Sequence, residues 1–254
     1  MGGERSCERP RIIASIEARM GSSRLPGKVL ADVLGQPALT RLIRRLRNCQ
    51  ELDGIILATS TEAADDVLVD WATTEGVPVH RGSEDDVLRR VVEAQRAMNA
   101  DIVVEITGDC ILVDPMLVDW GIQTFLENDC DVVTNARKLS FPLGADLQVY
   151  RLSDLEEVER TIYDPAVREH VSLYFYEHPE RYRVLHLLAP RCWEAPTYRL
   201  HLDYPEDLRF ITEVYRRLEP VYGDDFGIDV IMELLREEPE LVEINRYCEE
   251  RSVR

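Results

Sequence analysis

The sequence lacks the features that mark a secreted, membrane-spanning or zinc-binding protein. None of its six cysteines stands in a C-x-x-C pair, so neither a zinc site nor a redox motif is indicated. No apolar run approaches the ~18 residues that span a bilayer, and the polar residues 1–10 lack the apolar core of a secretion signal. We therefore expect a cytoplasmic protein with no membrane partner and a disordered N-terminus over residues 1–10.

Positive charge is scarce as well. Lysine and arginine number 30 against 48 aspartates and glutamates, which gives a net charge of −18. Because nucleic-acid-binding proteins carry basic surfaces, we expect no nucleic acid partner, and any anion site must be a local basic group. The 254 residues are 45% hydrophobic, which is enough for one large domain with its own core.

Short apolar segments alternate with segments of helical periodicity along the first half of the chain. Strands are predicted at residues 11–16, 54–59, 77–80, 101–107 and 131–134. Helices are predicted at residues 38–49, 63–75, 87–99 and 115–128. Near-continuous apolar strands separated by helices predict an α/β fold: a doubly wound, mostly parallel, Rossmann-like sheet with helices on both faces.

The second half of the chain is expected to extend the same sheet, because it contains neither an internal repeat nor a linker. Strands are predicted there at residues 144–151, 182–188 and 198–202. Helices are predicted at residues 153–160, 166–177, 207–218 and 227–237.

A basic, glycine-containing loop follows the first predicted strand. Its basic side chains are those of Arg19, Arg24 and Lys28, and no acid lies among them. Backbone N–H groups and hydroxyls that can bind anionic oxygens come from Gly21, Ser22 and Ser23. Since ligands of open α/β sheets bind at the carboxyl ends of strands, we interpret residues 18–28 as a nucleotide-triphosphate loop. The alternative is a solvated basic loop.

The spacing within this loop separates it from two known phosphate-binding motifs. The dinucleotide pattern G-x-G-x-x-G is absent. A P-loop has four residues between Gly and Gly-Lys and then Ser or Thr. Here five residues separate Gly21 from Gly27, and Val29 follows Lys28. The sequence therefore argues against a P-loop kinase.

Two aspartates follow predicted strands. Asp109 comes after residues 101–107, and Asp203 comes after residues 198–202. Carboxylates at strand ends can hold Mg²⁺ against a triphosphate. From spacing alone, two alternatives stay open: Asp109 as a turn residue and Asp203 as a helix cap.

These segments together resemble the CMP-sugar synthetases, the acylneuraminate cytidylyltransferase superfamily, and within it the spore-coat polysaccharide biosynthesis branch. The resemblance spans roughly residues 11–245, and its motifs occur in order along the chain. They are Ala18-Arg-Met-Gly-Ser-Ser-Arg-Leu-Pro-Gly-Lys-Val-Leu30, Ala58-Thr-Ser60 with Asp65-Asp66, His80-Arg-Gly-Ser-Glu-Asp-Asp-Val-Leu88, Ile106-Thr-Gly-Asp-Cys110 with Asp114-Pro115, Arg168-Glu-His-Val171 and Leu202-Asp-Tyr-Pro-Glu-Asp-Leu208.

The resemblance implies a fold of the nucleotide-diphospho-sugar transferase type and assigns roles to matching residues. The nucleotide-binding residues would be Ala18, Arg19, Gly21, Ser22, Ser23, Arg24, Lys28, Thr59, Arg81, Gly82, Ser83 and Thr107. Mg²⁺ would be bound by Asp109 and Asp203. The catalytic group would be Lys28, Arg19 and Asp109. The implied activity is transfer of CMP from CTP to a small anionic acceptor, with release of pyrophosphate.

The acceptor side departs from the sialic-acid and Kdo enzymes of this superfamily. Cys110-Ile-Leu follows Asp109, where those enzymes usually have proline and leucine, and their sugar-carboxylate pocket has no clear counterpart. Candidate acceptor-binding residues are Asn135, Arg137, Asp146, Gln148, Arg168, Glu169, His170, Arg199 and His201, each of which also fits a structural role. The acceptor therefore stays open between a sugar acid, an alditol phosphate and a small phosphonate.

We expect one cytidylyltransferase domain over residues 11–254. It would comprise a nucleotide-binding part (11–135), an acceptor and dimerisation part (136–200), and a metal-ligand return with C-terminal helices (201–254). The resemblance also predicts a homodimer. Alternative hypotheses are a non-catalytic nucleotide-binding or regulatory protein on the same fold and a nucleotidyltransferase that uses another nucleoside triphosphate.

Overall fold

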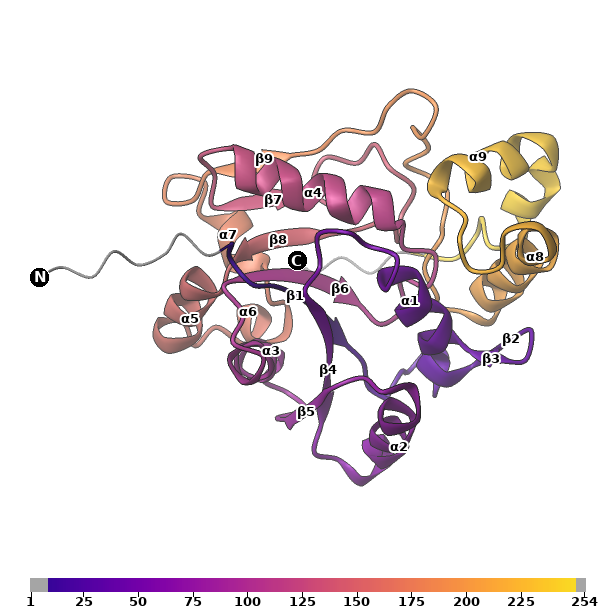
Figure 1. Cartoon of the computed structure of the whole chain (residues 1–254). Coiled ribbons are helices and arrows are strands. Elements are labelled where there is room, and N and C mark those ends of the chain that lie inside the picture. Colours follow the sequence, from indigo (N-terminus) through magenta and orange to yellow (C-terminus); the bar gives the residue numbers. More distant parts are fainter. Residues whose placement is uncertain (1–8, 250–254) are drawn as a thin grey trace, which may run out of the picture.

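A mostly parallel sheet organises the chain in the computed structural model, which describes residues 9–249 (Figure 1). The strand order is β5 (Val79–Gly82), β4 (Gly54–Ser60), β1 (Ile12–Glu17), β6 (Ile102–Thr107), β8 (Gln148–Arg151), β7 (Val132–Thr134) and β9 (Val184–His186). The first four strands are parallel, whereas β8 runs antiparallel to both β6 and β7. Of the segment predicted to be disordered, residues 1–8 lie outside the described part of the chain.

Side chains that alternate along the strands fill two hydrophobic cores, one on each face of the sheet. From β1, Ile12, Ala14 and Ile16 enter the first core, and Ile13 enters the second. The first core is covered by α1 (Ala38–Leu46), α2 (Asp66–Glu75), α4 (Pro115–Glu127), α8 (Pro205–Tyr222) and α9 (Ile228–Glu237). The second is covered by α3 (Val87–Ala97), α5 (Leu152–Thr161), α6 (Pro165–Glu169) and α7 (Leu173–Glu177). Figure 1 shows α4 and α3 on opposite sides of the sheet.

The prediction of one helix over residues 166–177 is wrong, because two short helices form there. Asp164 caps α6 by accepting a hydrogen bond from the Ala166 amide, and Pro165 occupies the first turn. His170 then adopts extended backbone angles (φ −114°, ψ 95°) that end the helix. The apolar periodicity continues through α7, so the pattern alone does not reveal the interruption.

The predicted strand at residues 198–202 is also wrong. A single bridge joins Arg199 to Leu143, and no strand forms there. Instead, the Leu200 amide donates to the Leu143 carbonyl (2.7 Å) and the Leu202 amide donates to the Asp109 carbonyl (2.9 Å). The backbone amides of this segment thus find their hydrogen-bond acceptors in two different loops and not in a neighbouring strand.

Several short elements fall outside the sequence prediction. They are the hairpin of β2 (Asp32–Val33) and β3 (Gln36–Pro37) and the 3₁₀ helices η1 (Lys28–Leu30) and η3 (Pro239–Ile244). The 3₁₀ helix η2 (Ala63–Asp65) forms the start of the helix predicted at residues 63–75. Of the strands predicted at 144–151 and 182–188, only the segments that form β8 and β9 pair in the sheet. In the described part of the chain, each helix is too short or too polar to cross a bilayer.

Candidate active site

The basic loop after β1 is held by backbone and carboxylate contacts. The Met20 amide donates to Asp65 Oδ1 (2.7 Å), and the other carboxylate oxygen of Asp65 accepts from the Ser60 hydroxyl. The Gly27 amide donates to the Met20 carbonyl (3.0 Å), which closes the loop. Gly27 has φ +71°, a left-handed conformation that favours glycine. The loop is therefore tied to the carboxyl end of the adjacent strand β4.

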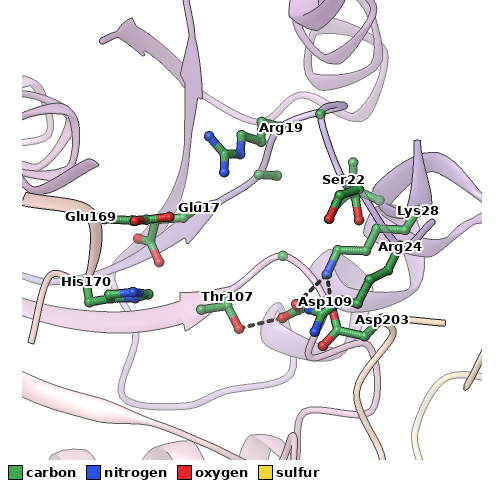
Figure 2. A pocket seen from close by; sticks show the side chains of 15 residues that line it. Glu17, Arg19, Ser22, Arg24, Lys28, Thr107, Asp109, Glu169, His170 and Asp203 are labelled. Atoms are coloured by element: carbon green, nitrogen blue, oxygen red, sulfur yellow. Dashed lines mark hydrogen bonds and ion pairs between the residues drawn. The ribbon is translucent and has the colours of Figure 1, made fainter. Parts of the chain in front are cut away.

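One lysine connects the loop to both aspartates. Lys28 Nζ lies 2.6 Å from Asp109 Oδ2 and 2.7 Å from Asp203 Oδ1, and an Arg24 guanidinium nitrogen lies 2.6 Å from the same Asp203 oxygen. Figure 2 shows the end of the Lys28 side chain between the two carboxylates, with dashed lines to both. Residues separated by up to 175 positions in the sequence thus meet at one ammonium group.

The ion pairs fix the charge states of this cluster. Burial would lower the pKa of Lys28, but Asp109 and Asp203 outweigh burial and raise it. Burial would raise the pKa of Asp109, but Lys28 and then His201 outweigh burial and lower it. Lys28 is therefore a cation and Asp109 an anion at neutral pH.

A buried network places Asp203 in front of α8. The carboxylate of Asp207, in the first turn of the helix, accepts from the backbone amides of Asp203 (3.0 Å) and Tyr204 (2.9 Å). It also accepts from the buried Arg199 guanidinium (3.1 and 3.2 Å) and from the Asn245 amide (2.8 Å). Asp207 therefore caps this helix, and the carboxylate of Asp203 faces Lys28.

A close approach of two strand ends places Asp109. A Cβ at Gly108 would lie 2.8 Å from the Glu17 carbonyl and 2.9 Å from the Ala18 Cβ, so only glycine fits between β1 and β6 here. The Thr107 hydroxyl donates to Asp109 Oδ1 (2.6 Å), which leaves Oδ2 for Lys28. Asp109 thus lies two residues beyond the end of β6, at the predicted strand end.

The cluster forms one wall of a cavity of about 490 Å³ at the carboxyl ends of β1 and β6. The cavity is lined by Glu17, Ala18, Arg19, Gly21, Ser22, Ser23, Arg24, Lys28, Val29, Thr107, Gly108, Asp109, Glu169, His170 and Asp203. We call it the loop cavity. In Figure 2, Glu17, Glu169 and His170 gather on the side opposite Lys28 and the aspartates.

A second cavity of about 260 Å³ adjoins the first and is called the side cavity below. Both cavities are lined by Glu17, Thr107, Glu169 and His170. The side cavity adds polar groups from β6, the loop after β7, β8, the break between α6 and α7, and α7 itself, namely Glu105, Arg137, Gln148, Ser172 and Tyr176. The interruption of the predicted helix at His170 is what places this residue at both cavities.

Most of the residues proposed for the nucleotide line the loop cavity, and four lie outside its lining. The hydroxyl of Thr59 is fully buried within β4. Arg81, Gly82 and Ser83 lie at and beyond the end of β5, where the Arg81 guanidinium donates to the Ser60 carbonyl (2.9 Å) and pairs with Asp66 (2.7 Å). Their segment approaches the loop through Glu84, which lies 3.6 Å from Arg19.

The residues proposed for the acceptor divide into two groups. Arg137, Gln148, Glu169 and His170 line the side cavity. The others line neither cavity. The Asn135 side chain hydrogen-bonds to the backbone of residues 145 and 147, and Asp146 accepts a hydrogen bond from the Gly144 amide. Arg168 faces Asp86 and Glu159, Arg199 contacts Asp207, and His201 lies 3.5 Å from Asp203. These contacts describe structural roles for the second group.

Sequence reasoning missed two acidic residues of the cavities, Glu17 and Glu105. Glu17 is the last residue of β1 and directly precedes the basic loop, so its position at a strand end was the available signal. Glu105 lies inside the apolar strand β6, where its carboxylate accepts from the Tyr150 hydroxyl (2.7 Å). A single acidic residue in an otherwise apolar strand was the signal for it.

A doubly wound sheet whose strand ends present a basic loop opposite two carboxylates is typical of nucleotidyltransferases. A family model described as "Cytidylyltransferase" matches residues 13–238, and the chain belongs to this family. It is a CTP-dependent nucleotidyltransferase. The resemblance found in the sequence and the predicted fold class are thereby confirmed.

Three similar proteins illustrate this membership. The chain is 36% identical over 211 residues to the spore coat polysaccharide biosynthesis protein SpsF of Bacillus subtilis, covering 81% of this chain and 87% of SpsF. It is 32% identical to a 3-deoxy-manno-octulosonate cytidylyltransferase of Chlorobium chlorochromatii, covering 87% of this chain and 93% of that protein. The structure of a cytidylyltransferase from Leptospira borgpetersenii superposes with a TM-score of 0.87 at 28% identity, covering 96% of this chain and all of that one.

Proposed function

We propose that the protein transfers CMP from CTP to a small anionic acceptor, releases pyrophosphate and uses Mg²⁺ at Asp109 and Asp203. The observation that carries this proposal is the contact of the Lys28 ammonium with both carboxylates in the loop cavity. A cation already sits between the two acids, in a cavity that the basic loop also lines.

The donor set fits magnesium. Carboxylate oxygens are hard donors, and Mg²⁺ usually takes one or two protein carboxylates together with phosphate oxygens and water. Within residues 9–249, no cluster of three or more histidine, cysteine, aspartate or glutamate ligands is present, which fits such a sparse site and not a structural metal cage. When bound, the ion would neutralise negative charge on the triphosphate.

The basic side chains of the loop would bind the triphosphate. Arg19, Arg24 and Lys28 line the same cavity, and the backbone of Gly21 and Ser22 lies beside them. Charge developing on the pyrophosphate leaving group would be stabilised by fixed guanidinium and ammonium groups. When nucleotide occupies the cavity, Lys28 can exchange a carboxylate partner for a phosphate oxygen, because its charge suits both.

The acceptor would enter from the side cavity, which adjoins the loop cavity at Thr107 and His170. An oxygen of the acceptor would attack the α-phosphorus in line with the departing pyrophosphate. Catalysis then rests on positioning and electrostatic stabilisation, and no covalent enzyme intermediate is required.

Pyrophosphate release tests this function. The enzyme is incubated with Mg²⁺, each nucleoside triphosphate in turn, and a panel of sugar acids, alditol phosphates and phosphonates. We expect release with CTP and with a subset of acceptors only. CTP binding without pyrophosphate release from any acceptor would contradict transfer and favour a regulatory nucleotide-binding protein.

A further inference from the structure

The turn between β4 and α2 carries two buried polar residues that take no direct part in the proposed binding of CTP. They are Ser60, the last residue of β4, and Asp65, the residue before α2, and neither lines the loop cavity or the side cavity. Asp65 is 2% exposed and Ser60 is fully enclosed. A buried carboxylate is costly unless its oxygens accept hydrogen bonds. The donors that contact Asp65 therefore indicate its role.

Asp65 does not cap the helix that it precedes. It occupies the N-cap position of α2, where an aspartate usually accepts a hydrogen bond from an amide of the first helical turn. Its side chain makes no such bond. By contrast, Asp86 at the N-cap of α3 accepts from the Arg89 amide at 3.0 Å. Helix capping therefore does not explain the buried carboxylate of Asp65.

The carboxylate of Asp65 instead holds the basic loop. Its Oδ1 accepts from the Met20 amide at 2.7 Å, and its Oδ2 accepts from the Ser60 hydroxyl. The Met20 carbonyl in turn accepts from the amides of Ser22 (2.9 Å) and Gly27 (3.0 Å). The loop is thus attached to the end of β4 at the same residue on which its own turns close.

The same turn also holds the segment after β5. Arg81 Nε donates to the Ser60 carbonyl (2.9 Å), and the Thr61 amide donates to the Gly82 carbonyl (2.9 Å). Arg81 and Gly82 belong to the residues proposed for the nucleotide, although they lie outside the lining of the loop cavity. One buried turn therefore contacts both parts of the chain to which nucleotide binding is attributed.

We propose that Asp65 is a positioning residue for the nucleotide, which acts through the Met20 amide and holds the basic loop in place beside the segment after β5. The inference rests on the proposed cytidylyl transfer and adds a residue to its nucleotide site. Arg19 and Lys28 lie on either side of Met20 in the chain, and both line the loop cavity (Figure 2). A loop that is fixed before the ligand arrives loses less conformational entropy on binding, so more of its attraction for the phosphates is expressed as affinity.

The affinities for CMP and CTP test this inference, because the two ligands differ by the two phosphates that the basic loop would bind. Calorimetry with Mg²⁺ and no acceptor gives both dissociation constants, and their ratio, CMP over CTP, measures the contribution of those phosphates. We expect Asp65→Ala to lower this ratio ~10-fold or more, and to raise the KM of CTP more than it lowers kcat. Lower folding stability alone leaves the ratio unchanged, because both ligands bind the same folded protein.

Two further variants separate the hydrogen bond from general effects of a substitution. Asp65→Asn keeps an oxygen that accepts from the Met20 amide, so it should keep the ratio within about threefold of the wild type. Asp119→Ala is the matched control, because the Asp119 carboxylate likewise accepts from backbone amides of another loop, those of residues 50 and 51 (2.9 Å each). That loop lines neither cavity, and this control should keep the ratio of the wild type.

If Asp65→Ala does not fold, Ser60→Ala is measured in its place. This variant removes the hydroxyl that orients the Asp65 carboxylate and should lower the ratio by about threefold. An unchanged ratio in Ser60→Ala would then overturn the inference.

The outcomes separate this inference from the proposed function. An unchanged ratio in Asp65→Ala overturns the positioning role, as does an equal fall in Asp65→Asn or in Asp119→Ala. A wild type that binds CMP as tightly as CTP overturns it as well. Pyrophosphate release by the wild type, with an unchanged ratio in Asp65→Ala, leaves cytidylyl transfer standing without Asp65. A ratio that falls in Asp65→Ala alone, while the wild type releases no pyrophosphate with any acceptor, supports the inference and contradicts the transfer.

Discussion

Lys28 contacts the two aspartates that we propose as magnesium ligands, and this contact explains how the site folds without a metal. Two carboxylates brought together in a partly buried wall repel each other, and an ammonium between them offsets that repulsion. The same ammonium can later face a phosphate. We therefore propose that one residue has a structural role in the free protein and a binding role with nucleotide.

Lys28→Ala should reduce CTP-dependent pyrophosphate release by ~100-fold or more, since it removes a fixed charge beside the triphosphate. The chain's other lysine, Lys138, is exposed, and Lys138→Ala serves as the control that keeps the rate. Steady-state kinetics and thermal unfolding are measured together. Wild-type turnover of CTP by Lys28→Ala would remove the loop from the proposed site.

Glu105 should make stability depend on pH. Burial raises its pKa from 4.5 to about 7, while the hydrogen bonds from Tyr150 and Ser172 act in the opposite direction. The folded state therefore holds a proton that the unfolded state loses first, so this stabilisation is present below pH 4.5 and lost as the pH rises through about 7. The pKa of Glu17, which faces it, is raised as well.

Glu105→Gln should flatten this dependence. Urea unfolding from pH 4.5 to 7.5 gives the free energy of unfolding at each pH. We expect the free energy of unfolding of the wild type to fall relative to that of the variant as the pH rises over this window. The fall is ~1.4 kcal/mol for each unit by which the pKa of Glu105 in the folded chain exceeds its pKa in the unfolded chain. Parallel curves for the two proteins would show that Glu105 is ionised throughout.

At the residue level, sequence order revealed Lys28 and Asp109 but not Glu17 and Glu105. Lys28 and Asp109 follow strand ends in recognisable motifs, and both line the loop cavity. Glu17 and Glu105 line the side cavity without belonging to a charged motif. Their proximity depends on the parallel pairing of β1 with β6, in which Ser15 is opposite Glu105 and Glu17 is opposite Thr107. Such register is a tertiary property that no local pattern contains.

The start of α8 is the element that presents Asp203. Asp207 is fully buried and accepts from two backbone amides of the preceding turn and from Arg199 and Asn245. Removing one member of a buried, hydrogen-bonded ion pair costs ~3–5 kcal/mol. This helix start therefore combines fold stability with placement of a proposed metal ligand.

Asp207→Ala should lower the free energy of unfolding by ~3–5 kcal/mol and also reduce turnover at temperatures where the variant remains folded. Glu206→Ala, in the same helical turn but more exposed, should change the free energy of unfolding by less than about 0.5 kcal/mol. Chemical denaturation compares the two variants. Similar losses for both would mean that the buried network does not hold this segment.

The elements of the first half were predictable because each buries a regular apolar pattern. The errors lie where polar contacts decide the backbone. Residues 198–202 bond to the loops at Leu143 and Asp109 and form no strand, and the interruption at His170 divides one apolar periodicity into two helices. Both departures place residues in the loop cavity. Asp203 follows the segment 198–202, and His170 is the residue at which the predicted helix is interrupted.

At the scale of the whole molecule, charge is distributed unevenly. The chain carries a net charge of −18, yet three basic side chains converge on the loop cavity. General attraction of polyanions is weak in such a field, so a phosphate ligand depends on this local group. The side cavity keeps the acidic character of the rest of the chain.

The whole molecule also presents an apolar surface that fits the predicted homodimer. Met116 (69% exposed), Leu139 (64%) and Leu188 (58%) lie around the ring contacts of Phe141 with Trp120 and Trp193. The Ala189 amide donates to the Ser140 hydroxyl, which joins the segments that carry Leu139 and Leu188. Large exposed apolar groups gathered in this way are typical of protein interfaces.

Sedimentation velocity tests this surface. The wild type should sediment as a species of twice the chain mass of 29.2 kDa, and the variant Leu139→Glu with Leu188→Glu should sediment as a monomer. Val221→Glu, at a 73% exposed apolar residue of α8, is the matched control and should remain dimeric. A monomeric wild type would contradict the dimer, and a dimeric double variant would place the interface elsewhere.

The central claim is that Asp109 and Asp203 hold the metal at which CMP is transferred. The most direct test is ³¹P NMR of CTP, Mg²⁺ and an acceptor from the panel, with the wild type and with Asp109→Ala as enzyme. Asp70→Ala, an exposed aspartate of α2, is the control. We predict equal amounts of pyrophosphate and a CMP-linked product from the wild type and the control, and neither from a folded Asp109→Ala. The same product at the same rate from Asp109→Ala would contradict the account.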